Sequence, residues 1–168
     1  TYGWDKSQLE PISRLPGIKE AEGVFYSDLI AQCQGGDESA VYRFYTIPEK
    51  INRLVLLEGR MPQAPDECLA DGFHNGKEVI GKTVSMTDDT SDTALDQLTQ
   101  RKFTIVGLVS TPLYMDTNRG NTAVGSGRIT NYFFVPEEAF DVAYYTEIHA
   151  TIEGDDTPYT QVYNDALS

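Results

Sequence analysis

The chain reads KFTIVGLVS from Lys102 to Ser110, and this stretch gives its clearest sign of secondary structure. Five of these nine residues are Phe, Ile, Val or Leu, which are common in strands and in protein cores. The apolar residues occupy neighbouring as well as alternating positions, which is typical of a strand that is covered on both faces. We therefore predict a buried strand over 102–110.

Short apolar segments flank this strand, and turn-forming residues separate them. Pro62 and Pro65 indicate a rigid loop before the first of these segments. The polar, acidic stretch at 87–99 predicts an exposed loop or a loose helical turn. The strands predicted in this region are 67–70, 79–86, 102–110 and 131–135, and one helical turn follows at 137–140.

The two ends of the chain combine helices with strands. Ser7 and Glu10 have the spacing of a capping box, which predicts a short helix. Pro158 suits the first turn of a last helix. The elements predicted here are a helix at 7–15, a hairpin of strands 23–34 and 40–47, a strand at 146–153 and a helix from Pro158 onward. Because strands and helices do not alternate regularly, the fold class is α+β rather than a βαβ repeat.

Size and charge limit the functions that we consider. The 168 residues suffice for one domain, or for one domain with a sizeable inserted lobe. The formal net charge is −13, and such a surface repels polyphosphate, so nucleic acid is not expected as a partner. No apolar run of about 18 residues occurs. The chain opens at Thr1 without a leader pattern and closes within a predicted helix, so we expect a longer parent protein.

The two cysteines, Cys33 and Cys68, do not fix the redox compartment. They form no C-x-x-C pair. Outside the cytosol they could form one disulfide. The interpretation that we favour is two buried thiols that pack as small hydrophobic side chains.

The only histidines are His74 and His149, and neither lies in a recognisable metal motif. Zinc needs three or four converging ligands, and the nearest approach is Cys68 with Asp71 and His74, at a spacing that matches no common pattern. His149 alternates with apolar residues along a predicted strand, so we expect it at the surface.

The sequence has 26 acidic residues, so some carboxylates lie side by side by chance, and such a pair does not by itself indicate a catalytic site. Glu137 and Glu138 open a helical turn, where the helix dipole favours acids. Asp88, Asp89 and Asp92 lack the order of a calcium loop. Nucleophile motifs and phosphate-binding loops are also missing from the sequence, so we expect no catalytic residue, no metal ligand and no cofactor in this domain.

Several short motifs keep the order found in one family of membrane proteins. They are LEGRMP at 57–62, PDECL at 65–69, IGKTV at 80–84 and FTIVGLV at 103–109, followed by STPLY at 110–114, RG at 119–120, GSG at 125–127, FVP at 134–136 and YTEI at 145–148. Together they resemble the extracytoplasmic, MacB-like periplasmic core domain of MacB/FtsX-type ABC-transporter permeases, in the form found in Gram-positive bacteria. The first 45 residues match only in outline, with a helix, LPGI at 15–18 and a hairpin.

The resemblance implies a mixed α/β lobe, 1–56 with 143–168, and a β-rich lobe, 57–142, inserted in its middle. Such a domain would lie on the outer side of the cell membrane, between two membrane helices of the same polypeptide, with both chain ends at one end of the fold. A separate ABC ATPase subunit would use ATP, and this non-catalytic domain would couple the motion of the membrane helices to substrate export or partner engagement. A second permease copy or subunit is a further expected partner.

One loop is the expected contact region. The stretch 112–129 is long and rich in Gly, and its Tyr114, Met115 and Arg119 are the partner or substrate contacts that we predict. Alternatively, Tyr114 and Met115 pack back on the inserted lobe. Two other functions stay open: a secreted small-ligand-binding module or small hydrolase with an acidic site near Asp88 or Asp156, and a purely structural, adhesin-like domain.

Overall fold

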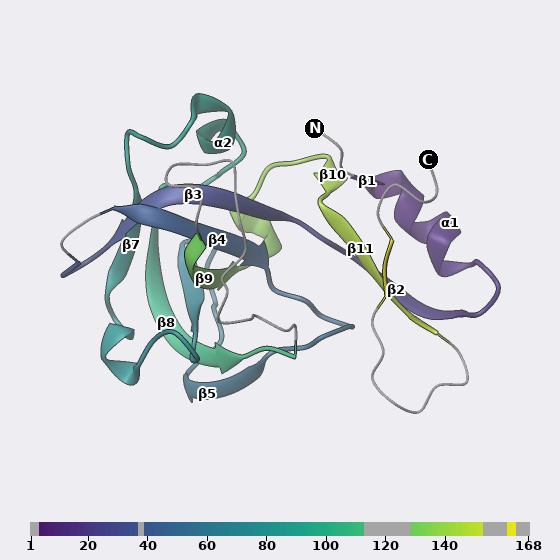
Figure 1. Cartoon of the computed structure of the whole chain (residues 1–168), viewed down its shortest axis with the longest axis horizontal. Coiled ribbons are helices and arrows are strands. Elements are labelled where there is room, and N and C mark those ends of the chain that lie inside the picture. The colour runs from purple at the N-terminus through teal and green to yellow at the C-terminus, as the bar shows by residue number, and fades with distance from the viewer. Residues whose placement is uncertain (1–3, 37–38, 113–128, 153–160, 164–168) are drawn as a thin grey trace.

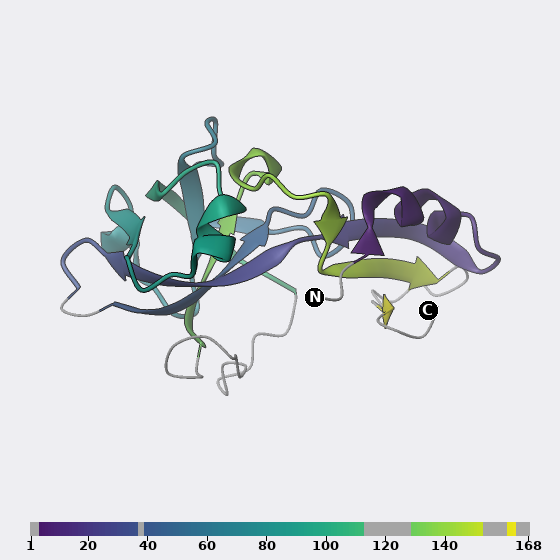
Figure 2. The same ribbon diagram turned by 90° about the horizontal axis from the view of Figure 1, so that it is seen from above.

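Figure 1 shows the computed structural model, which describes residues 4–36, 39–112, 129–152 and 161–163. The strands gather into a larger closed sheet and a smaller sheet that carries α1 (Leu9–Ser13). Seen from above, β2 (Ile18–Val24) and β3 (Tyr26–Cys33) form one long ribbon that runs from the smaller part into the larger one (Figure 2). In the described part of the chain, no helix has the length and hydropathy of a membrane span. The fold is α+β, as the sequence predicts, with much more strand than helix.

The larger sheet has seven strands in the order β5-β8-β6-β9-β4-β3-β7. Besides β3 they are β4 (Ala40–Thr46), β5 (Val55–Gly59), β6 (Glu67–Asp71), β7 (Thr83–Met86), β8 (Lys102–Ser110) and β9 (Ile129–Val135). Because β7 also pairs with β8, the strands from β8 to β7 form a closed ring, and β5 lies outside the ring on β8. The pairs β4–β9 and β6–β8 are parallel. Closure protects the ring strands from pairing with other chains.

The interior of the ring is the main core. Phe44 is fully buried there, and its ring packs on Phe103 and Phe133 at centroid distances of 5.7 and 5.3 Å. Strand β8 is also covered on its outer face, where Val106 and Val109 belong to a second buried cluster. Burial on both faces explains why the predicted strand at 102–110 is a continuous apolar run, and its bounds are confirmed.

The smaller part holds a three-stranded sheet in the order β12-β11-β2, with β11 at Glu147–Ile152 and β12 at Gln161–Tyr163. A two-stranded ribbon pairs β1 (Trp4–Asp5) with β10 (Tyr144–Tyr145), and a 3₁₀ turn at Lys6–Gln8 leads into α1. Ile12 of α1 is buried against Ile18 and Ile148. This small apolar cluster holds the helix on the sheet.

Three further helical segments are short: 3₁₀ turns at Lys77–Val79 and Glu137–Ala139, and α2 at Asp92–Asp96. The helical turn predicted at 137–140 and the loose turn predicted within 87–99 are confirmed. The strand predicted at 79–86 is shorter and begins at Thr83. Its early part bends because Gly81 has a φ of 93°, which interrupts an extended strand.

Two predictions for the ends of the chain are wrong. The segment Gln161–Tyr163, expected within a last helix, is a strand, because it pairs with β11 and covers an edge that would otherwise be free. The first helical segment is capped by Asp5 rather than Ser7. The Asp5 carboxylate accepts the Ser7 N–H at 2.8 Å, and the Gln8 side chain accepts the Asp5 N–H at 2.7 Å.

The boundary between the two sheets lies at Phe25, between β2 and β3. The predicted hairpin exists, since β3 and β4 pair antiparallel, but both strands belong to the closed ring. The division inferred from the resemblance placed all of 1–56 with the smaller part. The change of sheet at Phe25 comes before the first proposed lobe boundary at 57, whereas the smaller part resumes at β10 (Tyr144–Tyr145), directly after the second boundary at 142. The division into lobes itself stays a prediction.

Candidate functional site

The two sheets meet at Phe25, where hydrogen bonds cross between them. The Phe25 N–H donates to Thr46 Oγ1 at 3.2 Å, and the Thr46 N–H donates to the Phe25 carbonyl at 2.9 Å. The Tyr26 N–H donates to Thr146 Oγ1 at 3.0 Å, and that hydroxyl donates to the Tyr26 carbonyl at 3.2 Å. Both residues thus keep their backbone groups paired while the chain passes from one sheet to the other.

A carboxylate on β2 holds the loop that follows β4. Glu22 accepts the backbone N–H groups of Glu49 at 2.8 Å, Lys50 at 3.1 Å and Ile51 at 3.0 Å. Hydrogen bonds to an ionised acceptor are stronger than those between neutral groups, and successive backbone N–H groups form a favourable seat for an anion. This contact fixes a loop of the larger part against a strand of the smaller part.

His149 lies beside this contact, and its position corrects the sequence prediction. We expected it at the surface, but its side chain is 1% exposed. Its Nε2 lies 2.8 Å from Glu147 Oε2, and its Nδ1 lies 3.4 Å from the amide nitrogen of Asn52. Its register partner on β2 is Glu22. The face that strand alternation marks as polar is therefore the face that meets the loop at 49–52.

A cavity of about 510 Å³ lies beside the junction and is lined by residues of both parts. The smaller part contributes Lys6, Gly23 and Tyr145, and the larger part contributes Pro48 and Glu137. A Cβ on Gly23 would lie 2.1 Å from the Tyr145 ring, so only glycine lets this ring lie against β2. Its volume lies in the range of small-molecule sites in proteins, and its lining is more polar than apolar.

The LEGRMP segment forms a structural connection between β5 and β6. Gly59 has a φ of 79°, and a Cβ there would lie 2.3 Å from the Val106 carbonyl oxygen, so no other residue fits. Both terminal guanidinium nitrogens of Arg60 contact the Glu67 carboxylate, with Nη1 at 2.9 Å from Oε1. The Gln63 N–H donates to the same carboxylate at 2.7 Å. These contacts give Gly59 and Arg60 of the motif a structural role.

The Glu67 contacts predict a pH-dependent signal. Hydrogen bonding from Arg60, and then from the Gln63 N–H, lowers the pKa of Glu67 to about 2. Since the pKa in the folded state is depressed from its ordinary 4.5, the stabilisation is complete above about pH 4.5 and is lost as the pH falls through 2. Carbon-detected NMR titration should show this value, and Arg60→Met should return the pKa toward 4.5, whereas Arg101→Met should not. A Glu67 pKa near 4.5 in the unmodified protein would contradict the pairing.

The structure brings together only two of the three residues considered for zinc. Asp71 and His74 are in contact through Oδ2 and Nδ1, and both side chains are 3% exposed. Cys68 lies in the interior core cluster, on the other face of β6 from Asp71. Within the described ranges, no three His, Cys, Asp or Glu side chains are placed to hold a metal ion. Cys33 and Cys68 are free thiols; Cys68 is fully buried and Cys33 partly so, and burial raises the pKa of both.

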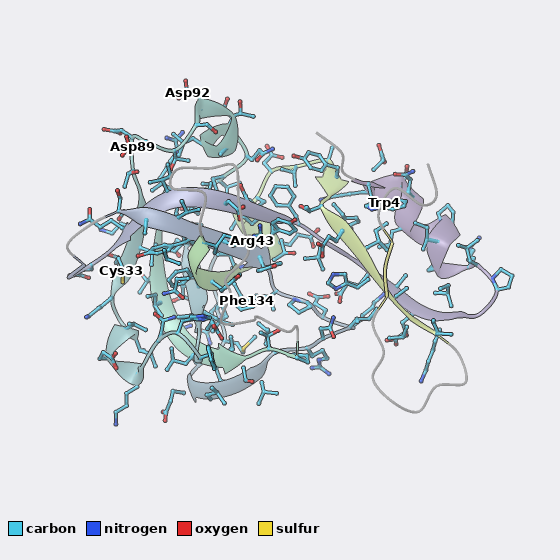
Figure 3. The ribbon with its side chains drawn as sticks, in the orientation of Figure 1. Trp4, Cys33, Arg43, Asp89, Asp92 and Phe134 are labelled. Carbon is cyan, nitrogen blue, oxygen red and sulfur yellow. The ribbon has the colours of Figure 1, made fainter. Side chains whose placement is uncertain are left out.

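The acidic candidates lie elsewhere. Asp88 and Asp89 are exposed, and Asp92 begins α2, whose capping residue is Ser91. Figure 3 shows Asp89 and Asp92 around α2, far from Trp4 in the smaller part. The predicted contacts Tyr114, Met115 and Arg119, and the acid Asp156, lie outside the described residues.

Sequence reasoning missed the residues that line the junction. Glu22 went unnoticed because β2 was not predicted, and nothing local to it points to backbone N–H groups 27 to 29 residues away. Lys6 and Tyr145 are brought together by the β1–β10 ribbon, which is too short to leave a periodic pattern. The available signal was Gly23, a glycine next to an alternating segment, which often marks a close approach.

Solved structures share this arrangement of sheets. The periplasmic region of MacB from Actinobacillus actinomycetemcomitans matches 94% of this chain and 68% of its own, with a TM-score of 0.57 and 17% identity. This chain has the fold of that region of MacB. The extracellular domain of the noncanonic ABC-type transporter YknZ from Gram-positive bacteria matches 96% of this chain and 90% of its own, with a TM-score of 0.54 and 12% identity. No protein-family model and no curated protein sequence matches the chain.

Proposed function

We propose that this chain is the extracytoplasmic domain of an ABC-transporter permease and that it catalyses no reaction. The observation that carries the proposal is the MacB-like fold, which extends over 94% and 96% of the chain in the two comparisons. The formal charge of −13 is compatible with a domain that stands clear of an anionic lipid surface.

The proposed partners follow from this role. Membrane helices of the same polypeptide would flank the domain, an ABC ATPase subunit would act through those helices, and a second permease copy or subunit would stand beside it. ATP would be used by the ATPase subunit. The domain would lie on the outer side of the cell membrane.

The coupling mechanism that we propose uses the junction at Phe25. A motion that starts in membrane helices reaches a partner only if the two parts of the domain move together or about a defined hinge. The long β2–β3 ribbon, the Thr46 and Thr146 hydrogen bonds and the Glu22 contact all resist relative motion of the two parts. Rigid transmission is therefore favoured over independent movement.

Glu22→Gln in the full permease, with its ATPase, tests this coupling. Glutamine keeps one acceptor oxygen but points an NH₂ group toward backbone donors, so amide exchange at 49–51 should accelerate about tenfold. We expect export to fall while ATP hydrolysis continues. The matched control is Glu20→Gln, an exposed carboxylate two residues earlier on the same strand. Normal export despite faster exchange would remove the junction from the mechanism.

The location has its own test. A cysteine placed at the exposed Lys102, in a background without Cys33 and Cys68, should react with a membrane-impermeant maleimide added to intact cells expressing the full protein. Labelling only after cell lysis would contradict the extracytoplasmic assignment, whatever the result for Glu22.

A further inference from the structure

The cavity at the junction already contains one seated ammonium group. Lys6 Nζ lies 5.5 Å from the centroid of the Tyr145 ring and 3.5 Å from Glu137 Oε1. An aromatic face beside a carboxylate is the arrangement by which proteins bind organic ammonium ions.

Lys6 is held only weakly between the Tyr145 ring and Glu137. The Lys6 and Glu137 side chains are 38% and 66% exposed, and ion pairs this accessible to water contribute little. Lysine also has a long, flexible side chain, so it can leave the ring without moving the backbone. A ligand that brings its own ammonium group and fills apolar space could therefore replace it.

The electrostatic environment favours a cation in this position. Burial raises the pKa of Tyr145, and the nearby carboxylates of Glu137 and Glu22 raise it further. The cavity lining has four carboxylates, Glu22, Glu49, Glu137 and Glu138, and three cationic groups, Lys6, Lys50 and Arg53. When Lys6 swings out, the remaining lining has four acidic and two basic side chains. The formal net charge of the whole chain, −13, also favours the approach of a cation.

The lining also provides apolar surface for the rest of such a ligand. Leu54 and Val142, which are partly exposed, line the cavity together with Met61, whereas the lining residues Phe25 and Phe140 are buried in the core. Met61 is 41% exposed, which leaves a polarisable surface open to a ligand. The volume of about 510 Å³ fits a small molecule rather than a folded partner.

The geometry points to a binding site for an amphipathic organic cation in this cavity, with the ammonium group of the ligand replacing Lys6 between the Tyr145 ring and Glu137. The apolar part of the ligand lies against Leu54, Met61 and Val142. This inference does not depend on the proposed function, because it concerns the isolated chain.

The binding test compares three probes of one shape and different charge: 4-phenylbutylammonium, 4-phenylbutanol and 4-phenylbutyrate. Trp4 is the only tryptophan and pairs in register with Tyr145, so its fluorescence should change when a probe binds beside Tyr145. We expect the ammonium probe to bind at least about tenfold more tightly than the alcohol, and the carboxylate more weakly still. Equal affinities, or tighter binding of the carboxylate, would overturn the inference.

Variants locate the probe. Tyr145→Leu should weaken ammonium binding about fivefold or more, while Tyr145→Phe, which keeps the ring, should not. Lys6→Ala should strengthen binding, because it removes the resident ammonium group. Since Tyr145→Leu could disturb packing, Glu137→Gln serves as a second variant at an exposed position, with Glu20→Gln as its control. Weaker binding in Lys6→Ala, or equal loss in Glu137→Gln and Glu20→Gln, would show that the cation binds elsewhere.

Discussion

Replacing Phe44 with alanine is expected to lower the free energy of unfolding by about 3–5 kcal/mol, because removal of the phenyl group leaves a cavity in the core. Phe44 is fully buried on β4. Its ring stacks on Phe133 with an interplanar angle of 19° and tilts against Phe103 at 35°. Since all three rings lie inside a closed ring of strands, the surrounding backbone cannot collapse to fill the space.

Urea unfolding followed by far-ultraviolet circular dichroism measures this loss. The melting temperature should fall by roughly 6–20 °C for a chain of this size. The matched control is Phe73→Ala, because Phe73 is 69% exposed and contacts only the edge of the His74 ring among the described aromatic side chains. That variant should lose less than about 1.5 kcal/mol. Similar losses of stability at both positions would mean that the interior of the closed ring of strands is not the main core.

The same core explains which elements could be predicted from the sequence. Strand β8 was predicted with its observed bounds, because burial on both faces leaves a long apolar run between polar residues. A shorter apolar run does not establish burial by itself, since Val55, Leu56 and Leu57 of β5 are exposed. Strands β6 and β9 and the β3–β4 hairpin were also found, since each has apolar, β-branched or aromatic residues between turn signals. Local chemistry was sufficient for these elements.

Elements that depend on distant partners were missed. In β2 the buried residues Ile18, Ala21 and Val24 are three positions apart, which does not match the alternation of a strand. Part of the irregularity is a bulge in β2 itself: Thr151 pairs with Glu20 and Ile152 with Ile18, so Lys19 is an extra residue between Ile18 and Ala21. Strand β12 was predicted as a helix, since only pairing with β11 makes it extended.

The junction site was the least predictable feature. Lys6, Glu22, Glu137 and Tyr145 come from four separate elements, and each is of an ordinary type in an acidic sequence. The fold brings them together through β1–β10 pairing and through the crossing at Phe25. A sequence without aligned relatives holds no signal for such a non-local arrangement. Its recognised motifs lie instead in strands, such as FTIVGLV in β8, and in their connections, such as LEGRMP between β5 and β6.

Replacing Asp28 with asparagine is expected to cost about 3 kcal/mol, because it leaves the charge of Arg43 with little water around it. Asp28 and Arg43 face each other across β3 and β4, and their side chains are 11% and 16% exposed. Arg43 Nε lies 2.6 Å from Oδ1 and Nη2 3.0 Å from Oδ2, which is a two-pronged contact. Figure 3 shows Arg43 near the middle of the molecule.

Arg43 has further contacts that only a guanidinium can make. Its Cζ lies 4.3 Å from the centroid of the Tyr26 ring. Burial raises the pKa of Tyr45 to about 12, although the charge of Arg43 and its hydrogen bond to the phenol oppose this shift. Arg43→Lys should therefore also destabilise the protein, because an ammonium group cannot form the two-pronged contact and stack on the ring together.

A double variant separates the value of the pair from the cost of breaking it. Asp28→Leu combined with Arg43→Met removes both charges and keeps the volume, so its unfolding free energy should lie within about 1 kcal/mol of the unmodified protein. The control pair is Glu10 and Arg14 on α1, which are 71% and 76% exposed, and Glu10→Gln should not change stability measurably. If the double variant lost as much stability as Asp28→Asn, the pair itself would be stabilising. The small loss expected here means instead that Asp28 is required because Arg43 is charged. The main role of Arg43 is then to order the side chains of Tyr26, Asp28 and Tyr45.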